Sequence, residues 1–254
     1  MYRYLSLKKE NGTAVIQFLR PNQLNAMNRE FMNEIADSLK DCFEDPAVKV
    51  LILTGSGRAF MAGADIKEYA AQTDAEFVAF QNKGKEIYEA IENSNKPVIA
   101  AVNGFALGGG FEICLACDIV IAEKNAKFGL PEVNIGLNPG GGGTQRLIQK
   151  VSMNRAKEIL FFGGQYTAEQ MLDWGIINDV VEGDELLERA EALSAKLQRR
   201  SLEAIGEMKA LLNVSVSPRG IDERRDIEIQ TLFGLFHTEQ AKTRIAAFTN
   251  KNKT

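Results

Sequence analysis

Residues 97–122 read PVIAAVNGFALGGGFEICLACDIVIA, and this stretch decides the fold class. Its first six residues are apolar, which predicts a buried strand over 97–102 that ends at an Asn-Gly pair. Three glycines at 108–110 then lead into a helix that carries residues 111–117, and a second apolar strand follows over 118–122. A strand, a helix and another buried strand in direct succession are typical of a parallel sheet, so we predict an α/β protein.

The same alternation extends toward the N-terminus from this stretch. Strands are predicted over 13–18 and 48–54, where apolar and β-branched residues are concentrated. Helices are predicted over 28–43, with Asn28 as the N-cap, and over 74–93. After about residue 143 the pattern turns helical, and further helices are predicted over 168–174, 184–198, 201–214, 221–236 and 238–251. The apolar face of the last of these suits either a partner subunit or its own domain.

Length and composition are those of an ordinary globular chain. The 254 residues fit one large domain, or one domain with a smaller appendage. The formal net charge of -4, from 30 basic and 34 acidic residues, argues against a surface built mainly for nucleic acid or anionic lipid. The N-terminal residues show no signal or transit pattern, and the longest apolar stretches are too short to span a membrane. We therefore expect a cytoplasmic protein.

The rarest residue types exclude several kinds of site. His237 is the only histidine, so we expect neither a zinc site with several imidazoles nor a Ser-His-Asp triad, and we interpret it as a capping or packing residue. Cys114 and Cys117 spell C-x-x-C inside an apolar predicted helix, and with Cys42 they are interpreted as reduced thiols. Neither a phosphate-binding P-loop nor a G-x-G-x-x-G fingerprint occurs.

Backbone donors are the main chemical feature of the glycine-rich segment that begins at Gly104. The glycines at 108–110 expose N–H groups at the positive end of the following helix, where they could stabilise an oxygen that gains negative charge. Glu112 lies in the first turn of that helix, beside whatever the glycines bind. The alternative is a tight turn followed by an acid that compensates the helix dipole, and the segment alone leaves both open.

Two further segments have a similar character. Glu132 follows a proline that fixes its backbone, and the glycines at 140–143 offer more donors. Paired carboxylates can do acid and base chemistry, although a solvated loop glutamate is the simpler interpretation of Glu132 alone. Small residues over 59–67 allow close backbone approach, and Lys67 could meet a phosphate; a compact turn with a surface lysine is the alternative.

In this order, the segments resemble the crotonase superfamily, also called the enoyl-CoA hydratase/isomerase superfamily. The resemblance covers essentially the whole chain and is carried by residues 20–26, 60–67, 96–112 and 128–147. It implies a spiral of repeated ββα units, placed here over residues 1–198, and a helical region over 199–254 that mediates trimerisation. Homotrimers or homohexamers are therefore implied.

The resemblance also implies roles for individual residues. The N–H groups of Ala64 and Gly109 would form an oxyanion hole for a thioester carbonyl. Glu112 would be the base that activates water, and Glu132 the acid that protonates C2. The substrate or its CoA moiety would meet Asn25, Ala26, Ala62, Asp65, Ile66, Lys67, Gly108, Pro131 and Gly140.

Because both glutamates of true hydratases are present, the resemblance favours an enoyl-CoA hydratase. Such an enzyme adds water in syn fashion to a trans-2-enoyl-CoA, giving a 3-hydroxyacyl-CoA as in fatty-acid β-oxidation, and it uses no metal or other cofactor. Leu130 stands where many hydratases carry glutamine, which leaves the acyl length open, and residues 69–83 are expected to help line the acyl tunnel. Asn22 replaces a frequent charged residue, which weakens one expected CoA contact.

Two alternatives to hydration remain at this stage. One is an enoyl-CoA isomerase of the same fold, which shares the oxyanion hole. The other is a non-catalytic homologue that binds RNA or a protein partner. The negative net charge and the lack of an aromatic-basic stripe count against RNA binding.

Overall fold

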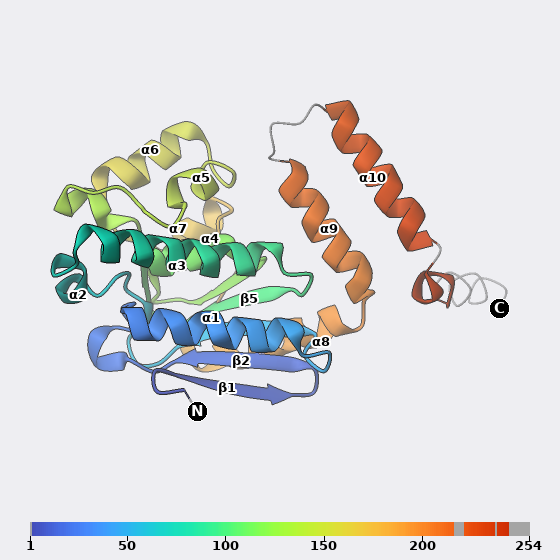
Figure 1. Ribbon diagram of the computed structural model, residues 1–254, viewed down its shortest axis with the longest axis horizontal. Coiled ribbons are helices and arrows are strands. Elements are labelled where there is room, and N and C mark those ends of the chain that lie inside the picture. Colours follow the sequence, from blue (N-terminus) through green and yellow to red (C-terminus); the bar gives the residue numbers. More distant parts are fainter. Residues whose placement is uncertain (1, 216–220, 237, 244–254) are drawn as a thin grey trace.

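The computed structural model describes residues 2–215, 221–236 and 238–243, and it confirms the α/β prediction. Within these residues, one sheet has the strand order β1-β2-β3-β5-β7-β10 and a smaller sheet the order β4-β6-β8-β9. Strands β1, β2 and β5 of the larger sheet are labelled in Figure 1. The strands are β1 (Leu5–Glu10), β2 (Thr13–Phe18), β3 (Val50–Gly55), β4 (Ala59–Met61), β5 (Val98–Val102), β6 (Phe105–Leu107), β7 (Ile119–Glu123), β8 (Lys127–Gly129), β9 (Tyr166–Thr167) and β10 (Asp179–Val181).

Helices cover both faces of the larger sheet and continue beyond it. They are α1 (Arg29–Glu44), α2 (Ile66–Ala70), α3 (Asp74–Asn93), α4 (Gly109–Ala116), α5 (Gly143–Leu147), α6 (Met153–Phe162), α7 (Ala168–Asp173), α8 (Leu186–Gln198), α9 (Leu202–Ser215) and α10 (Ile221–Phe236). Short 3-10 turns are η1 (Pro21–Gln23), η2 (Pro131–Ile135) and η3 (Gly183–Glu185).

The larger sheet is the centre of the molecule. β1 runs antiparallel to β2, and the remaining neighbours in this sheet are parallel. Every residue of β3 is buried, as expected for a central strand with both faces covered. Leu51 and Leu53 belong to the main core with α1, α3 and α4, whereas Val50 and Ile52 pack in a smaller core against α8. The apolar runs of the sequence therefore fill two layers of core, one on each side of the sheet.

The predicted strands and helices of the first half are confirmed, with small shifts at their ends. The strand predicted over 48–54 begins at Val50, because the Val48 N–H closes a turn on the Asp45 carbonyl at 3.1 Å. The side chain of Asn28 caps α1 by accepting the Phe31 N–H at 2.9 Å. A capping box between Thr73 and Glu76 begins α3.

The smaller sheet consists of strands that the sequence pattern did not predict. β4, β6 and β8 have three residues each, which is too short for a period of two to stand out. Each follows a strand of the larger sheet, so that β3-β4, β5-β6 and β7-β8 are successive pairs, with helical segments after each pair. This repetition is the expected spiral of ββα units, and it brings the ends of β4, β6 and β8 together.

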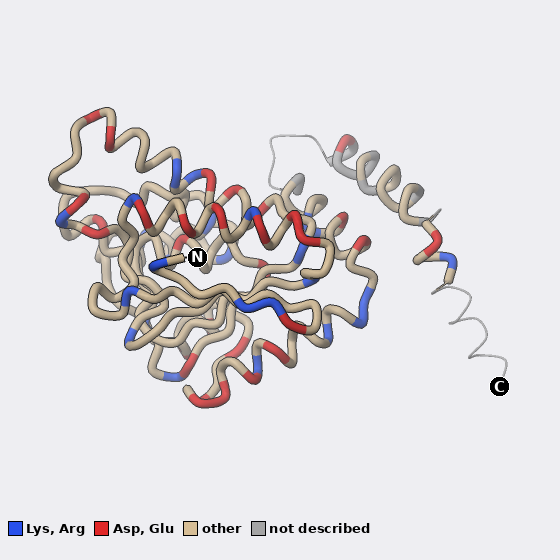
Figure 2. The backbone as a smooth tube through the Cα atoms, turned by 60° about the horizontal axis from the view of Figure 1, so that its bottom comes forward, with Lys and Arg blue, Asp and Glu red and all other residues tan. Residues whose placement is uncertain are grey.

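The C-terminal helices form a hairpin, and a buried lysine of α9 helps to anchor it to the core. Helix α10 packs on α9 and stands away from the core in both views (Figures 1 and 2). The Lys209 ammonium group of α9 donates to the Ile91 carbonyl at 2.7 Å and to the Asp118 carboxylate at 2.8 Å. The helices predicted over 201–214 and 221–236 are confirmed within a residue. His237 and residues 244–251 of the last predicted helix lie outside the described residues.

The described residues show no separation of charge by sign and no candidate membrane span. Basic and acidic residues intermix along the elements rather than separating by sign (Figure 2). None of the described helices combines the length and the apolar character that crossing a bilayer requires.

Candidate active site

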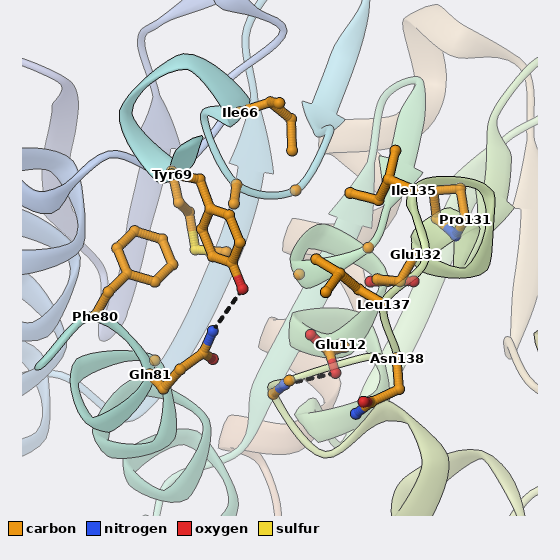
Figure 3. A pocket seen from close by; sticks show the side chains of 18 of the residues that line it. Ile66, Tyr69, Phe80, Gln81, Glu112, Pro131, Glu132, Ile135, Leu137 and Asn138 are labelled. Carbon is orange, nitrogen blue, oxygen red and sulfur yellow. Dashed lines mark hydrogen bonds between the residues drawn. The ribbon is translucent and has the colours of Figure 1, made fainter. Parts of the chain in front are cut away.

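A cavity of about 300 Å³ lies where the short strands of the smaller sheet end (Figure 3). Its walls come from the segment between β4 and α2, from α3, from the start of α4, and from η2 with the glycine run after it. Most of the predicted site residues line this cavity: Ala62, Ala64, Ile66, Gly108, Gly109, Glu112, Pro131, Glu132 and Gly140. The fold therefore brings three separate sequence segments to one place.

Two backbone turns meet at one side of the cavity. Gly63 has a φ of +89°, which L side chains rarely adopt, and a Cβ atom there would lie 3.3 Å from the Leu107 carbonyl oxygen and 3.7 Å from the Gly109 nitrogen, so this turn favours glycine and lies close to the start of α4. Met27 forms two backbone hydrogen bonds with the residues on either side of Ala64: its N–H donates to the Gly63 carbonyl, and its carbonyl accepts the Asp65 N–H. The N–H of Ala64 itself therefore points away from Met27. Gly109 is the first residue of α4, where a helix leaves its N–H groups without intrahelical partners.

Glu112 is held by the second glycine run. Its side chain lies in the first turn of α4 and is only 3% exposed. One carboxylate oxygen, Oε1, accepts the N–H groups of Gly141 and Gly143, each at 2.8 Å. Burial raises the pKa of Glu112, while these two amide groups and the nearby Arg146 lower it, with a net upward shift. The carboxylate is thus buried but strongly oriented.

Glu132 faces the same space from η2, across from Tyr69 and Gln81 (Figure 3). Its Oε2 atom is buried without a hydrogen-bond partner among the described residues. Burial raises the pKa of Glu132 to about 7, and the negative charge of Glu112 adds to the shift. The two carboxyl groups therefore differ in their surroundings: Glu112 has two amide donors from the glycine run and a cation beside it, whereas the backbone donor to Glu132 is its own N–H.

A second hollow adjoins the cavity at Ala64 and Ile66, which line both spaces. Three more predicted site residues line this hollow: Ala26, Asp65 and Lys67. Basic groups also reach it, since Arg3 and Arg20 are among its walls. The Arg20 guanidinium is 9% exposed and pairs with the Asp65 carboxylate at 3.1 Å.

Asn25 is placed differently from the other predicted binding residues, because it lines neither of the two hollows. Its side chain is fully buried and donates to the carbonyls of Ser56 and Ala59, while its oxygen accepts the Arg20 N–H at 2.8 Å. Its φ of +56° lies in the left-handed region. Asn25 therefore ties the turn after β2 to the segment between β3 and β4.

The sequence analysis missed two residues that surround Glu112. Tyr88 of α3 is a buried wall of the cavity, and a Cβ atom added at Gly141 would overlap its ring. Arg146 of α5 pairs with Glu92 of α3 through Nη2 at 2.6 Å and also donates to the Gly141 carbonyl. An arginine shortly after a glycine run was a usable signal, but its partner is distant in the sequence. Among the described residues, no cluster of histidine, cysteine or acidic side chains is grouped to hold a metal ion.

Comparisons with known proteins agree over nearly the whole chain. The family model described as enoyl-CoA hydratase/isomerase matches residues 8–254. The crotonyl-CoA hydratase of Syntrophomonas wolfei is 40% identical, with 99% of this chain and 97% of that protein covered. The short-chain-enoyl-CoA hydratase of Clostridium acetobutylicum is also 40% identical, covering 97% and 95%. The crystal structure of an enoyl-CoA hydratase from Bacillus anthracis superimposes with a TM-score of 0.93, at 31% identity and with 98% and 97% covered.

The unequal surroundings of the two carboxyl groups lead to a prediction about their titration. In the free protein, we expect the Glu132 carboxyl to titrate with a pKa of about 7, because burial and the charge of Glu112 both favour its protonated form. Glu112→Gln removes that charge and should lower the Glu132 pKa. The measurement is a carboxyl ¹³C NMR titration of glutamate-labelled protein, with Glu132→Gln used to assign the signal. A Glu132 pKa in the ordinary carboxyl range, unaffected by Glu112→Gln, would contradict this interpretation.

Proposed function

Because this chain belongs to the enoyl-CoA hydratase/isomerase family, we propose that it is an enoyl-CoA hydratase. The proposed reaction is the reversible addition of water to a trans-2-enoyl-CoA, which gives a 3-hydroxyacyl-CoA and corresponds to the hydration step of fatty-acid β-oxidation. One observation carries the proposal: Glu112 and Glu132 line the same cavity as two glycine turns with backbone donors. Hydration needs a base for water, an acid for carbon, and a site for the developing negative charge on the thioester oxygen.

Backbone N–H groups supply the electrophilic part of this mechanism. The thioester oxygen of the substrate lies between the N–H groups of Ala64 and Gly109 and accepts a hydrogen bond from each. As electron density moves from the double bond onto that oxygen, the donors and the positive end of α4 stabilise it. C3 of the substrate becomes electrophilic, and C2 gains enolate character.

The two glutamates divide the proton transfers. Glu112 takes a proton from water as the oxygen adds to C3, because its two amide donors and Arg146 favour the carboxylate form. Glu132 delivers a proton to C2, because its pKa of about 7 keeps a large fraction of it protonated near neutrality. Since both carboxyl groups lie on one side of the bound substrate, water and proton add to the same face. The pair titrates as a coupled unit, so the roles belong to the pair in its singly protonated state.

The CoA moiety occupies the second hollow in this proposal. This position is supported by continuity, since Ala64 and Ile66 line both spaces. It is also supported by charge, because Lys67 and Arg3 could meet the phosphates of the nucleotide end. Coenzyme A is part of the substrate, and the proposed chemistry uses no further cofactor. The cytoplasmic location expected from the sequence stays part of the proposal, supported by three buried cysteines that are free thiols.

A short acyl group fits the cavity best. A hydrocarbon cavity of about 150 Å³ holds the six carbons of benzene, so this cavity of about 300 Å³ has room for roughly twelve heavy atoms, including the thioester end. The Tyr69 hydroxyl accepts the Gln81 amide N–H at 3.0 Å, and the Gln81 side chain also lies against Gly140. This Tyr69–Gln81 pair closes the space opposite the carboxylates. The names of the two relatives, crotonyl-CoA and short-chain-enoyl-CoA hydratase, support the same choice.

Assembly through the C-terminal helices, as a homotrimer or homohexamer, is also part of the proposal. The division into a core over residues 1–198 and an oligomerisation region over 199–254 follows the change from sheet to helical hairpin. Large apolar side chains on this hairpin are exposed in the single chain, among them Met208 at 52%, Ile229 at 63% and Leu232 at 65%. An apolar surface of this kind is typical of a subunit interface.

The proposed activity is tested directly on crotonyl-CoA. The purified protein should remove the ultraviolet absorbance of the conjugated thioester, and Glu112→Gln and Glu132→Gln should each lower kcat by at least about 100-fold, as expected when one acid-base group is lost. Glu86→Gln, an exposed position on α3, is the matched control and should leave kcat unchanged. Wild-type protein that is inert toward short, medium and long enoyl-CoA would refute hydration. Faster conversion of a 3-enoyl-CoA than of a 2-enoyl-CoA would instead indicate an isomerase.

The acyl-length proposal is tested with a series of enoyl-CoA substrates. For the wild type, kcat/KM should be highest with four to six acyl carbons and should fall with longer chains. Gln81→Ala opens the Tyr69–Gln81 pair that closes the cavity and should raise kcat/KM for longer substrates relative to crotonyl-CoA. The expected gain is about fourfold for each methylene that becomes buried, since one buried CH₂ contributes about 0.8 kcal/mol. Lys85→Ala, exposed on the same helix, should keep the wild-type profile. An identical profile for Gln81→Ala would exclude the Tyr69–Gln81 pair as the limit on acyl length.

The assembly proposal is tested by sedimentation velocity. The wild-type protein should sediment with three or six times the mass of one chain. Leu232→Glu places a charge on the exposed apolar face of α10 and should shift the distribution toward smaller species. Leu187→Glu, at a 43% exposed position on α8, is the control and should leave the mass unchanged. A wild-type monomer at micromolar concentration would contradict the proposed role of the C-terminal region.

A further inference from the structure

We propose that Arg146, paired with Glu92, is a positioning residue that fixes the glycine run at 140–143 and thereby orients the Glu112 carboxylate. Arg146 lines neither hollow and is remote from any substrate atom in the proposed mechanism. Its effect would pass through the backbone of the glycine run. The inference rests on the proposed function insofar as Glu112 is the base of that reaction.

The guanidinium group of Arg146 is held on three sides. Its side chain is 13% exposed, which is unusual for an arginine on a five-residue surface helix. Nε and Nη2 bind the two carboxylate oxygens of Glu92, at 2.5 and 2.6 Å, in a bidentate pair. The third nitrogen, Nη1, donates to the carbonyl of Gly141. The pair therefore joins the end of α3 to the glycine run.

The bond to Gly141 acts on the peptide that separates the two donors to Glu112. Gly141 and Gly143 each donate their N–H to Oε1 of Glu112, and the carbonyl that accepts Arg146 belongs to the peptide between them. Gly142 has a φ of +90°, and a Cβ atom there would overlap Nη1 of Arg146. The backbone conformation that presents both amides to one oxygen is thus the conformation in which the guanidinium can bind.

The same guanidinium places a positive charge behind the carboxylate. Its Cζ atom lies 5.5 Å from the centre of the Tyr88 ring, and Tyr88 is itself a wall of the cavity. The ionisable groups around Glu112 are Arg146 from α5, Tyr88 and Glu92 from α3, and Glu132 from η2. Among these, Arg146 is the group whose charge favours the Glu112 carboxylate.

An ordinary stabilising ion pair would have different consequences. Arg189 and Asp179 form such a pair at 2.7 Å with 37% and 30% of their side chains exposed, and neither residue lines the cavity. Loss of that pair affects stability alone. Loss of Arg146 should alter the orientation and the ionisation of one catalytic carboxylate, and these are measurable separately from stability.

The test compares Arg146→Met, Arg146→Lys and Glu92→Gln with Arg189→Met as the matched control. We expect Arg146→Met to lower kcat by about 100-fold with little change in KM, the scale of loss that misplacement of a reacting group causes. The acidic limb of the pH profile of kcat/KM should move to higher pH, because Glu112 loses a cation and its two oriented amide donors. Arg146→Lys should recover part of the loss, since lysine keeps the charge but cannot bind Glu92 and Gly141 together. Glu92→Gln should lower kcat as Arg146→Met does, because the guanidinium loses its bidentate partner, but the acidic limb should move less, because the positive charge of Arg146 remains. Arg189→Met should match the wild type.

Two outcomes would overturn the inference. One is an Arg146→Met or Arg146→Lys enzyme that keeps kcat within twofold and an unmoved acidic limb. The other is a loss of melting temperature equal to that of Arg189→Met with no change in the pH profile. Carboxyl ¹³C NMR of Glu112 gives a readout that does not depend on activity. The Glu112 pKa should rise in Arg146→Lys, because lysine cannot bind Glu92 and Gly141 together, and this rise is expected even if the wild type hydrates no enoyl-CoA. That combination would refute the proposed function while supporting the positioning role.

Discussion

The close approach of two backbone turns, at Gly63–Ala64 and at Gly108–Gly109, is the constraint on which the site depends. Gly63 and Gly108 have φ values of +89° and +52°, in the region that L side chains rarely adopt. A Cβ atom at Gly110 would overlap the Met61 backbone, so α4 must begin directly against β4. This contact drives α4 into the core, where all eight of its residues are buried. Glu112 is consequently carried into the wall of the cavity, where it is 3% exposed.

Burying two carboxyl groups in one small cavity disfavours their charged forms, and the two groups are compensated to different degrees. Glu112 receives two amide donors on one oxygen and has a cation nearby, whereas Glu132 retains a buried oxygen that has no partner within the described part of the chain. The same residue type therefore acquires two different proton affinities from its surroundings. Acid-base chemistry of this kind requires no histidine, since glutamates can transfer the protons and backbone N–H groups can stabilise the negative charge. A chain with a single histidine is therefore compatible with it.

Elements with a long, continuous apolar pattern could be predicted from the sequence, whereas three-residue strands and contacts between residues distant in the chain could not. Strands such as β2 and β5 and helices such as α3 were predicted because apolar runs and caps are local signals. The three-residue strands β4, β6 and β8 owe their existence to pairing with one another, which no local pattern records. Asn25 was predicted to meet the ligand, but its amide is used entirely within the protein. The position of Arg146 beside the glycine run was not predicted, because its partner Glu92 lies 54 positions earlier.

The last turn of α3 has a further significance, because it is a junction between parts of the molecule with separate tasks. The carbonyls of Ile91 and Glu92, which the helix end leaves open, are closed by Lys209 and Asn213 of α9. The side chain of Glu92 meanwhile holds Arg146 on the opposite side. The C-terminal hairpin and the glycine run at 140–143 are thus both held by the last turn of α3. Helix α9 therefore supports the candidate active-site cavity although the cavity walls come from other elements, because it holds the helix end that carries Glu92.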